Sequence, residues 1–336
     1  MSKGSISSNS PTVLVTGGAG YVGSTLVMAL LHQQYKVIVV DNLSFGGESL
    51  LGVWHHPDFK FIKADITDAA AIKKIFAEHS IDGVVHLAAI VGDPACAKQP
   101  DLAKHVNGDG ALKLLELARN AKVKRFIFAS TCSNYGKMAD ANSYVDENST
   151  LAPVSLYAEL KVKFEKVLLE KPAHDDGFCP TALRFATVYG VSPRMRFDLT
   201  VNEFVRELTL GRELEIFGEK FWRPYCHVAD FARAIDLVLK SEPERVAYKV
   251  FNVGDTNENY QKKMIVDEIK KFIPDAKVKY VTRNEDPRDY RVTFEKIKKE
   301  LGFTVSKKVP DGIREIKYLI DHHVIPNPDD PKYKNV

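Results

Sequence analysis

The sequence predicts an α/β protein: a doubly wound parallel sheet followed by a smaller C-terminal α/β unit. Three observations lead to this fold class. A glycine-rich turn follows the first run of apolar β-branched residues, strand-like and helix-like runs alternate through the first half of the chain, and the pattern becomes more interrupted from Tyr189 onward. Such alternation is typical of parallel sheets whose two faces are covered by helices. We expect a first unit at residues 11–188, to which 227–253 return, and a second unit at 189–226 and 254–325.

The overall composition is that of an ordinary globular protein and narrows the classes of partner. The 336 residues include 47 basic and 44 acidic side chains, so the net charge of +3 indicates neither a nucleic acid nor a membrane surface as partner. No apolar run is long enough to span a bilayer, and the polar, Ser-rich first ten residues lack the apolar core of a signal peptide. We expect a cytoplasmic protein with flexible tails at residues 1–10 and 327–336.

The four cysteines carry no metal signature. Cys96, Cys132, Cys179 and Cys226 are scattered along the chain without the spacing of a zinc or iron–sulfur site. We therefore expect free thiols, as in a reducing compartment, and no metal.

The glycine-rich turn has the residue order of a diphosphate-binding site. The strand Val13–Thr16 is followed by Gly17, Gly20 and Gly23, and then by a helix predicted at Ser24–Gln33. Gly17 allows a sharp turn off the strand, Gly20 allows the backbone to approach a pyrophosphate, and Gly23 allows the helix to pack closely on the sheet. The N-terminal N–H groups of this helix would face the phosphates.

An acidic residue completes the dinucleotide pattern. A second apolar strand at Val37–Val40 ends in Asp41, eighteen residues beyond Gly23. A carboxylate at that place accepts hydrogen bonds from both ribose hydroxyls of an adenosine and repels a 2′-phosphate. The sequence therefore predicts a dinucleotide site and favours NAD over NADP.

The third strand also ends in an acidic residue. Phe59–Ile62 leads to Asp65, which could bond the adenine amino group or cap the helix expected at Ala69–His79. Asp68 is better placed as the helix cap, which leaves Asp65 for the nucleotide.

The fourth strand, Val84–Ala89, ends in small residues against which a nucleotide could lie. His86 is interpreted as a buried histidine with a satisfied ring, because it stands inside an apolar strand. Asn107 lies in a helix expected at Asp101–Ala121, where it either reaches the site or faces water.

The chemistry is predicted at the end of the fifth strand. Arg125–Ala129 runs into a stretch crowded with hydroxyl groups that includes Thr131, and a helix expected at Ser155–Glu170 carries Tyr157 and Lys161 on one face. A free tyrosine, with a pKa of about 10, is too rarely ionised to be a base at neutral pH, but a neighbouring ammonium and a positive nicotinamide favour the phenolate. Tyr157 could then take a proton from a substrate hydroxyl while the carbon gives hydride to NAD. Thr131 would bond the same oxygen, and Lys161 would also hold the nicotinamide ribose.

These motifs resemble those of the extended short-chain dehydrogenases/reductases, specifically the NAD-dependent nucleotide-sugar epimerases and dehydratases. The resemblance spans about Thr12 to Ile320. It is carried by Thr16–Gly23, Asp41–Leu43, Asp65–Ile66, Leu87–Ala89, Ser130–Gly136, Tyr157–Lys161, Leu183–Gly190, Arg223–Val228 and Arg288. It implies a Rossmann domain, a small C-terminal domain that binds a sugar nucleotide, and a homodimer formed through the helices at Asp101–Ala121 and Ser155–Glu170.

The resemblance also implies roles for single residues. The catalytic residues would be Thr131, Tyr157 and Lys161. The residues that bind NAD would be Gly17, Gly20, Tyr21, Val22, Gly23, Asp41, Asn42, Asp65, Ile66, Leu87, Ala88, Ala89, Asn107, Tyr157 and Lys161. The residues that bind a nucleotide-diphosphate sugar would be Thr131, Ser133, Thr187, Arg194, Arg196, Arg223 and Arg288. Guanidinium groups match phosphates bidentately, and the family pattern supports Arg223 and Arg288 most strongly.

Three departures from the family pattern narrow the reaction. Cys132 and Ser133 stand where sugar 4,6-dehydratases carry Asp-Glu, so that elimination lacks its usual acid and base. The catalytic cysteine of 3,5-epimerases is matched by Ser133, which makes Cys132 a packing residue. Thr187 replaces a common Asn that donates to the substrate diphosphate, and this alters how that group is held.

The reactions that remain after these exclusions need only hydride transfer and one base. A nucleotide-sugar 4-epimerase fits: C4 is oxidised, the bound ketone rotates, and hydride returns to its other face. A C4 dehydrogenase or reductase acting on a heptose or deoxysugar nucleotide uses the same residues, and differs in whether NADH and the ketone leave. A 4,6-dehydratase and a non-catalytic NAD sensor are further alternatives, and the presence of Tyr157 and Lys161 counts against the sensor.

Overall fold

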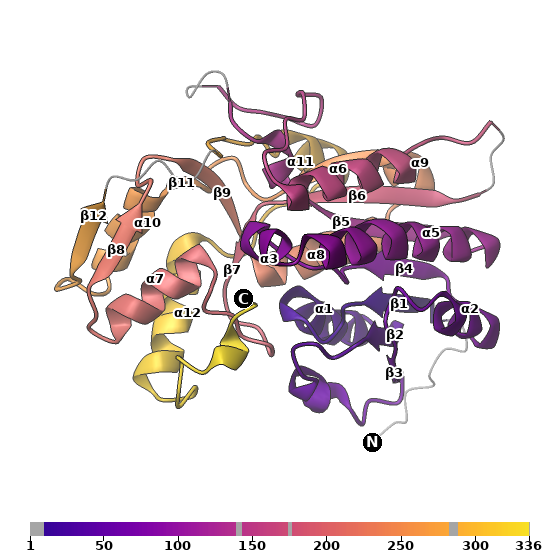
Figure 1. The fold of residues 1–336 in the computed structure, drawn as a ribbon, viewed down its shortest axis with the longest axis horizontal. Helices are drawn as coiled ribbons and strands as arrows, with labels where there is room; N and C mark the ends of the chain where they lie inside the picture. The colour runs from indigo at the N-terminus through magenta and orange to yellow at the C-terminus, as the bar shows by residue number, and fades with distance from the viewer. Residues whose placement is uncertain (1–9, 139–142, 174–176, 282–287, 336) are drawn as a thin grey trace.

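The computed structural model describes residues 10–138, 143–173, 177–281 and 288–335, and its centre is one seven-stranded sheet (Figure 1). All pairs in the sheet are parallel, in the order β10-β6-β5-β4-β1-β2-β3. The strands are β1 (Thr12–Thr16), β2 (Lys36–Asp41), β3 (Phe59–Lys63), β4 (Gly83–His86), β5 (Arg125–Thr131), β6 (Cys179–Phe185) and β10 (Lys249–Val253). This confirms the predicted doubly wound sheet. The strand order reverses between β1 and β4, and ligands bind at such a switch point.

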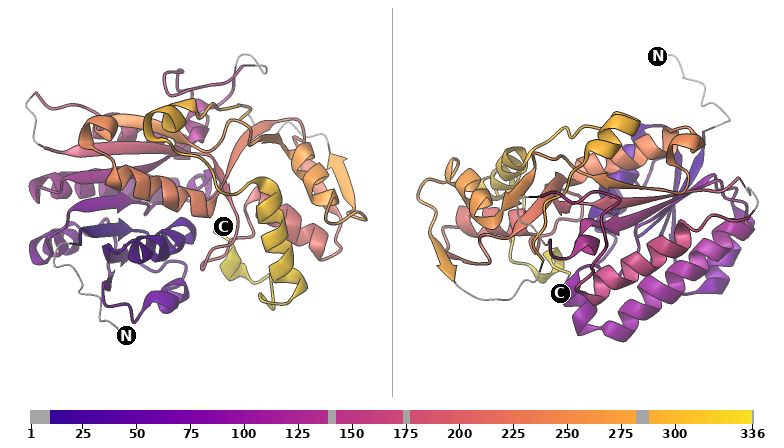
Figure 2. Two further views of the ribbon diagram at one scale, coloured as in Figure 1. Left: turned by 180° about the vertical axis from the view of Figure 1, so that it is seen from behind. Right: turned by 90° about the horizontal axis from the view of Figure 1, so that it is seen from above.

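Alternate residues of the strands are buried against two different layers of helices. Val13 and Val15 of β1 belong to one apolar cluster and Leu14 to another, because successive side chains point to opposite faces of a strand. The first cluster includes α1 (Tyr21–His32), α8 (Val228–Lys240) and α11 (Glu295–Leu301); the second includes α2 (Ala69–Glu78), α5 (Ala111–Asn120) and α6 (Leu156–Leu168). Figure 2 (right) shows the purple-to-magenta helices of the second layer along one face.

A smaller α/β part lies beside the carboxyl ends of the strands (Figure 1). Its two short sheets are β11 (Asn259–Gln261), β9 (Trp222–His227) and β7 (Thr187–Tyr189), and β12 (Val278–Val281) with β8 (Leu214–Phe217). They share a cluster of buried apolar residues with α7 (Thr200–Thr209), α10 (Lys262–Lys270) and α12 (Val309–Asp321). The short remaining elements are η1 (Glu48–Val53), α3 (Asp93–Lys98), α4 (Pro100–Lys104), η2 (His105–Gly110), η3 (Cys132–Tyr135), α9 (Pro243–Val246) and η4 (Pro331–Tyr333).

The helix expected at Asp101–Ala121 is present and runs without a break from Pro100 to Asn120. It consists of α4, one π-helical segment (η2) and α5, and α3 precedes it without having been predicted. Gly108 and Gly110 lie in the π-helical segment, where an i→i+5 turn replaces the normal ladder. Helix α1 also begins at Tyr21, three residues before the predicted start.

Some strands and one helix of the smaller part were not predicted. Strand β9 contains Pro224, and a proline argues against a strand that has a neighbour on both sides. Thr187 begins β7, two residues after the end of β6 at Phe185. Helix α12 buries Val309 and Ile313 one turn apart, a helical spacing that the sequence analysis did not use.

Residues 327–335 of the expected C-terminal tail contact residues on either side of α7. The Tyr333 ring contacts the Phe197 ring at 5.6 Å between centroids, and the Phe197 amide donates to the Tyr333 carbonyl at 2.8 Å. Arg212 pairs with Asp329. These contacts involve few apolar residues, so no repeating apolar pattern in this stretch indicated them. The other expected tail falls on residues 1–10, of which 1–9 lie outside the described residues.

Two further findings concern the chain as a whole. All four cysteines are free and buried, as expected from their spacing. Within the described ranges, no helix is long and apolar enough to cross a membrane, and no group of three or more His, Cys, Asp or Glu side chains could hold a metal ion.

Candidate active site

The glycine turn lies at the carboxyl end of β1 and has the shape of a diphosphate cradle. Gly17 has a φ of +75°, and a Cβ there would lie 2.7 Å from the Ala88 amide nitrogen. A Cβ on Gly23 would lie 2.1 Å from the Gly17 carbonyl oxygen, so both positions require glycine. A Cβ on Gly20 would meet only that carbonyl, at 3.3 Å, which leaves open space beside the turn. Gly20 also caps α1 without a side-chain hydrogen bond, so the first N–H groups of α1 can receive an anion.

Asp41 and Asp65 lie next along the carboxyl ends of the strands. Asp41 accepts hydrogen bonds from the amides of Ala19 at 3.0 Å and Leu43 at 2.8 Å, which places its carboxylate beside the glycine turn. Burial raises the pKa of Asp41 in spite of these bonds. The Asn42 amide donates to Asp65 at 2.7 Å, so the predicted residues Asp41, Asn42 and Asp65 are brought together. Burial alone would raise the pKa of Asp65, but hydrogen bonds from Thr67 and Asn42 hold it below its usual value.

The end of β4 closes the other side of the turn. Leu87 donates its amide to the Thr16 carbonyl at 3.1 Å, and Ala88 is the residue that Gly17 approaches. The backbone of this small-residue segment therefore lies directly against the glycine turn, where Ala89 follows. Ile66, in the segment that follows β3, is buried.

His86 is a buried structural residue, as predicted. Its Nδ1 lies 2.8 Å from Thr16 Oγ1, and its ring packs against Phe128 and Phe164. Burial, assisted by the charge of Lys161, lowers the pKa of His86 to about 3. The ring is therefore neutral at any pH at which the protein works.

The His86 pKa predicts an acid-sensitive stability. The folded-state pKa of His86 lies below the ordinary value of 6.5. The stability associated with the neutral ring is therefore fully present above pH 6.5 and is lost as the pH falls toward 3. Because the folded protein keeps this ring neutral, the free energy of unfolding of the wild type should fall by about 3 kcal/mol between pH 7 and pH 4.5. Urea unfolding at both pH values should show a smaller loss for His86→Gln, whose amide can still bond Thr16. Equal losses would contradict the assignment.

Asn107 is bonded to the backbone of the loop that follows β4, directly after Leu87–Ala89. Its side chain is buried and makes two hydrogen bonds to the backbone of one residue: Ile90 N–H donates to its Oδ1 at 2.8 Å, and its Nδ2 donates to the Ile90 carbonyl at 2.9 Å. Because both ends of the amide are used, Asn107 fixes the loop that follows β4. Its side chain is buried, so the alternative in which Asn107 faces water is wrong.

Tyr157 and Lys161 lie on α6, one turn apart, against the end of β5. Lys161 Nζ donates to the Ala129 carbonyl at 2.7 Å and lies 5.7 Å from the centre of the Tyr157 ring. Burial lowers the pKa of Lys161 to about 8, so the ammonium form still dominates at neutral pH. Burial raises the pKa of Tyr157, and the charges of Cys96 and Asp93 add to this effect. The chain alone thus does not produce the lowered Tyr157 pKa that the sequence analysis attributed to Lys161 together with a cofactor.

Thr131 ends β5 with its hydroxyl oriented by the backbone. Its Oγ1 accepts a hydrogen bond from the Ser133 amide at 3.1 Å, so its own proton remains to be donated. Cys132 points the other way: its Sγ donates to the Arg184 carbonyl, and burial raises the pKa of the thiol. This supports the interpretation of Cys132 as a packing residue.

Two of the predicted arginines gather around Tyr290. The Arg223 guanidinium lies 5.1 Å from the centre of the Tyr290 ring, and the Tyr290 hydroxyl donates to Ser133 Oγ at 3.4 Å. Arg288 pairs with Asp93 at 2.6 Å. Burial raises the pKa of Tyr290, while Arg223 and Arg288 both act to lower it, which places both cations near one phenol.

Thr187 lies on the same side, in the register pair Thr187–Tyr225 between β7 and β9. The other two predicted arginines, Arg194 and Arg196, lie on the loop between β7 and α7. Arg196 forms a two-point pair with Asp198, at 2.9 and 2.8 Å. The Arg194 guanidinium lies 4.6 Å from the centre of the Phe45 ring, on the cofactor side.

The sequence analysis missed Asp93 and the role of Ser155. The Ser155 hydroxyl caps α6, by accepting from the Ala158 amide, and donates to Asp93 at 2.7 Å. Asp93 therefore joins the start of the Tyr157 helix to Arg288. A serine just before a helical run is a recognisable cap, but its partner Asp93 is distant in sequence and leaves no signal.

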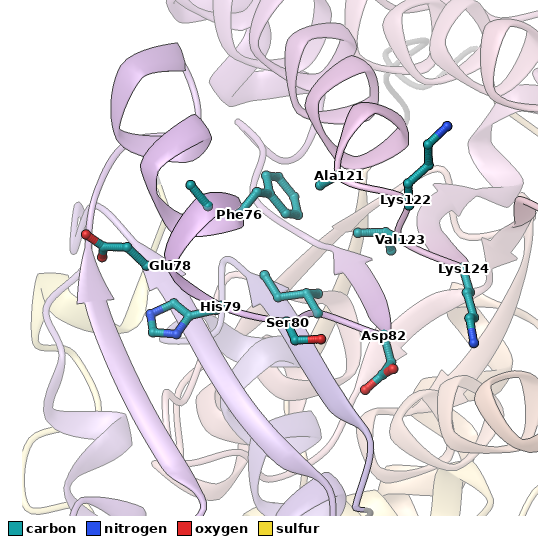
Figure 3. Close-up of a pocket in the computed structure, with 11 residues that line it drawn as sticks. Phe76, Glu78, His79, Ser80, Asp82, Ala121, Lys122, Val123 and Lys124 are labelled. Atoms are coloured by element: carbon teal, nitrogen blue, oxygen red, sulfur yellow. The ribbon is translucent and has the colours of Figure 1, made fainter.

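A cavity of about 500 Å³ lies at the opposite end of the sheet and is not the site (Figure 3). It is lined by residues 76–82 and 121–124, which precede β4 and β5. Figure 3 shows Asp82, Lys122 and Lys124 around it. Ligands of open α/β sheets bind at the carboxyl ends of the strands, so this amino-terminal hollow does not bear on the chemistry.

Comparison with known proteins agrees with this geometry. The model of the NAD dependent epimerase/dehydratase family matches residues 13–254. UDP-glucuronate 4-epimerase of Thermodesulfobacterium geofontis is 30% identical over 312 residues, which cover 90% of this chain and 93% of that protein. UDP-glucose 4-epimerase of Bacillus subtilis is 27% identical over 319 residues, or 88% and 92% of the two chains.

Solved structures give the same result. UDP-glucose 4-epimerase of Thermotoga maritima, determined with UDP-glucose, has a TM-score of 0.82 and 30% identity, and the match covers 93% of this chain and 99% of that one. UDP-glucose 4-epimerase of Thermus thermophilus in complex with NAD has a TM-score of 0.81 and 26% identity, with the same coverage. With the glycine cradle, Asp41 and the Tyr157–Lys161 pair in place, these matches lead to one conclusion: the chain belongs to the NAD-dependent epimerase/dehydratase family.

Proposed function

We propose that the protein is a nucleotide-sugar 4-epimerase that oxidises C4 to a transient ketone and reduces it again on the opposite face. The observation that carries this proposal is the pairing of the half-buried Tyr157 with the buried Lys161 on α6, together with an open glycine cradle. The curated relatives described above are 4-epimerases of UDP-sugars, which supports the same reaction and a UDP-sugar as the substrate class.

The residues of the cradle fit NAD. Gly20 leaves the space that a diphosphate requires, the uncapped start of α1 supplies N–H donors, and Asp41 supplies a carboxylate for the adenosine ribose. We propose that Asn42, Asp65, Ile66 and Leu87–Ala89 line the adenosine half. A bound NAD⁺ would supply the hydride acceptor for C4 and a positive charge that adds to that of Lys161.

Tyr157 is proposed to move the proton. Its phenol removes the proton of the C4 hydroxyl as the carbon is oxidised, and it returns the proton on reduction. Burial raises its pKa in the protein alone, so the proposal requires the nearby Lys161 ammonium and the cofactor charge together to favour the phenolate. Thr131 donates its free proton to the same substrate oxygen, because its Oγ1 lone pair is already used by the Ser133 amide.

The substrate diphosphate is proposed to bind between Arg223 and Arg288. Both lie at Tyr290, and Ser133 and Thr187 supply hydroxyl groups on the same side. Arg288 would exchange its contact with Asp93 for a phosphate. Arg196 lies close enough to act on the pKa of Tyr157, so it is proposed to face the sugar from its place beside Asp198.

A direct assay tests the reaction. The protein is incubated with UDP-glucose, UDP-glucuronate and UDP-arabinose in turn, and the sugars are followed by proton NMR while absorbance at the NADH band is recorded. We expect C4 interconversion of at least one substrate without accumulation of NADH. Stoichiometric NADH with a keto-sugar would instead establish the C4 dehydrogenase, and no conversion of any nucleotide sugar would contradict the proposal.

The remaining parts of the proposal concern organisation. We propose a cofactor domain at residues 11–188 with 227–253, and a sugar-nucleotide domain at 189–226 and 254–325. We propose a cytoplasmic homodimer formed through α4–α5 and α6, which expose Leu102, Leu112 and Val167. Sedimentation equilibrium tests the dimer, and a monomer at micromolar concentration would contradict it.

A further inference from the structure

The loop that carries Arg194 is attached to the first turn of α1. The Tyr21 hydroxyl donates to the Gly190 carbonyl at 2.6 Å, and the Ser192 hydroxyl donates to the Tyr21 carbonyl at the same distance. Ser192 Oγ also lies 3.1 Å from Ser24 Oγ. These contacts hold the loop against the helix whose N-terminus forms the cofactor cradle.

Arg194 extends from this loop toward the other side of the cradle. Its guanidinium lies 4.6 Å from the centre of the Phe45 ring. Phe45 belongs to the loop that follows Asp41, and Ser49 in that loop donates to the Ala19 carbonyl of the glycine turn at 2.8 Å. The Arg194 side chain thus reaches from a loop held on α1 to the loop after β2, which itself contacts the glycine turn through Ser49.

Arg194 is a buried cation without a carboxylate partner among the described residues. The residue is only 7% exposed, its Nε has no hydrogen-bond partner, and its Nη2 donates to the Lys334 carbonyl at 3.2 Å. The nearby acid, Asp198, is already engaged at two points by Arg196. A buried charge needs a partner, and a guanidinium is well matched to phosphate oxygens.

The C-terminal segment fixes this loop from outside. Phe197 donates its amide to the Tyr333 carbonyl, Asn335 donates its amide to Asp198 at 2.9 Å, and Lys334 supplies the carbonyl that Arg194 bonds. The segment therefore positions the Arg194 guanidinium without neutralising its charge.

We propose that Arg194 binds the diphosphate of the dinucleotide and clamps it in the glycine cradle. The inference assigns Arg194 to the cofactor, whereas the sequence analysis assigned it to the substrate diphosphate. It rests on the proposed function only in requiring that NAD occupies the cradle. Such a clamp suits a reaction in which the reduced cofactor must stay bound until hydride has returned to the sugar.

The test measures binding to protein that has been stripped of nucleotide. Arg194→Met keeps an unbranched apolar stem and removes the guanidinium with its charge. Arg194→Lys keeps the charge and loses the planar fork, and Arg314→Met is a matched control at an exposed arginine of α12. Titration calorimetry is done with NAD⁺, ADP-ribose, AMP and UDP. The two dinucleotide-type ligands contain a diphosphate, AMP contains one phosphate, and UDP represents the substrate side.

We expect Arg194→Met to raise the dissociation constants of NAD⁺ and ADP-ribose by about 10- to 100-fold, as expected for a hydrogen-bonded charge. The constants for AMP and UDP should stay within about threefold, Arg194→Lys should lie between the two, and Arg314→Met should match the wild type. Less NAD should also co-purify with the Arg194→Met protein.

Three results would overturn the inference. A loss of UDP affinity with NAD⁺ affinity intact would assign Arg194 to the substrate, and unchanged affinities for all four ligands would leave it without a binding role. If Arg194→Met fails to fold, Arg194→Lys is measured instead. A wild-type affinity and off-rate for NAD⁺ in that variant would also overturn the inference. The outcome is separable from the proposed reaction, because a protein that binds NAD⁺ through Arg194 but epimerises no sugar would contradict only the latter.

Discussion

Tyr157→Phe should lower kcat by about 10³-fold while the protein still binds NAD, because the substitution removes the proton-transferring oxygen and little else. The Tyr157 ring lies beside the Lys161 ammonium, and phenylalanine preserves that contact. The measurement is the rate of C4 epimerisation under saturating UDP-sugar, together with the dissociation constant of NAD⁺. A loss confined to kcat marks an interaction made in the transition state rather than in the ground state.

The control is Tyr318→Phe, which removes a phenol oxygen from an exposed position on α12. It should have wild-type kcat and NAD⁺ affinity. Substantial activity in Tyr157→Phe would assign the proton transfer to another group. A large loss of NAD⁺ affinity would instead show that the phenol serves chiefly to bind the cofactor.

Arg184→Met should destabilise the protein by about 3–5 kcal/mol, because it leaves a buried carboxylate without its cation. Arg184 and Glu165 are both about 95% buried and form a multi-point pair, with Arg184 Nε 3.1 Å from Glu165 Oε1. Ser130 Oγ donates to the same carboxylate at 2.7 Å, and Arg184 Nη1 donates to the Tyr135 hydroxyl at 2.9 Å. The network joins β5, α6 and β6 directly behind Thr131 and Lys161.

Urea unfolding of matched variants separates the cost of the orphaned charge from the cost of lost packing. The double variant Arg184→Met with Glu165→Leu replaces both charges by apolar groups, and it should recover most of the stability. If the double variant is as unstable as Arg184→Met, the unpaired carboxylate is not the cause. Epimerase activity should fall in the single variant in parallel with the unfolded fraction.

The cofactor half of the fold could be predicted because its signals are local. The glycine turn and Asp41 require particular residues at fixed spacing, and strands buried on both faces appear as short continuous apolar runs. The Tyr157–Lys161 spacing likewise follows from one helical turn. These features do not depend on what the chain does elsewhere, so they can be recognised before folding.

The features that could not be predicted concern contacts between distant segments. Asn107 carries an amide that suits either a ligand or a backbone, and only the position of Ile90, seventeen residues away in sequence, shows that the backbone takes it. The β9 strand contains a proline that argues against pairing, yet it is paired on both sides. The C-terminal segment has little apolar periodicity and is held mainly by backbone and charged contacts.

By itself, the sequence determined the doubly wound sheet, the dinucleotide cradle and the residues able to transfer a proton, because each rests on covalent geometry or on spacing within one element. The tertiary structure decided the electrostatic environment of those residues. It placed Lys161 over the Phe128 ring and on the Ala129 carbonyl, and it raised the pKa of Tyr157 by burial. It also buried Arg194 without a carboxylate partner in the part of the chain that the structure describes. Burial and charge pairing depend on which distant segments meet, and no local pattern of residues contains that information.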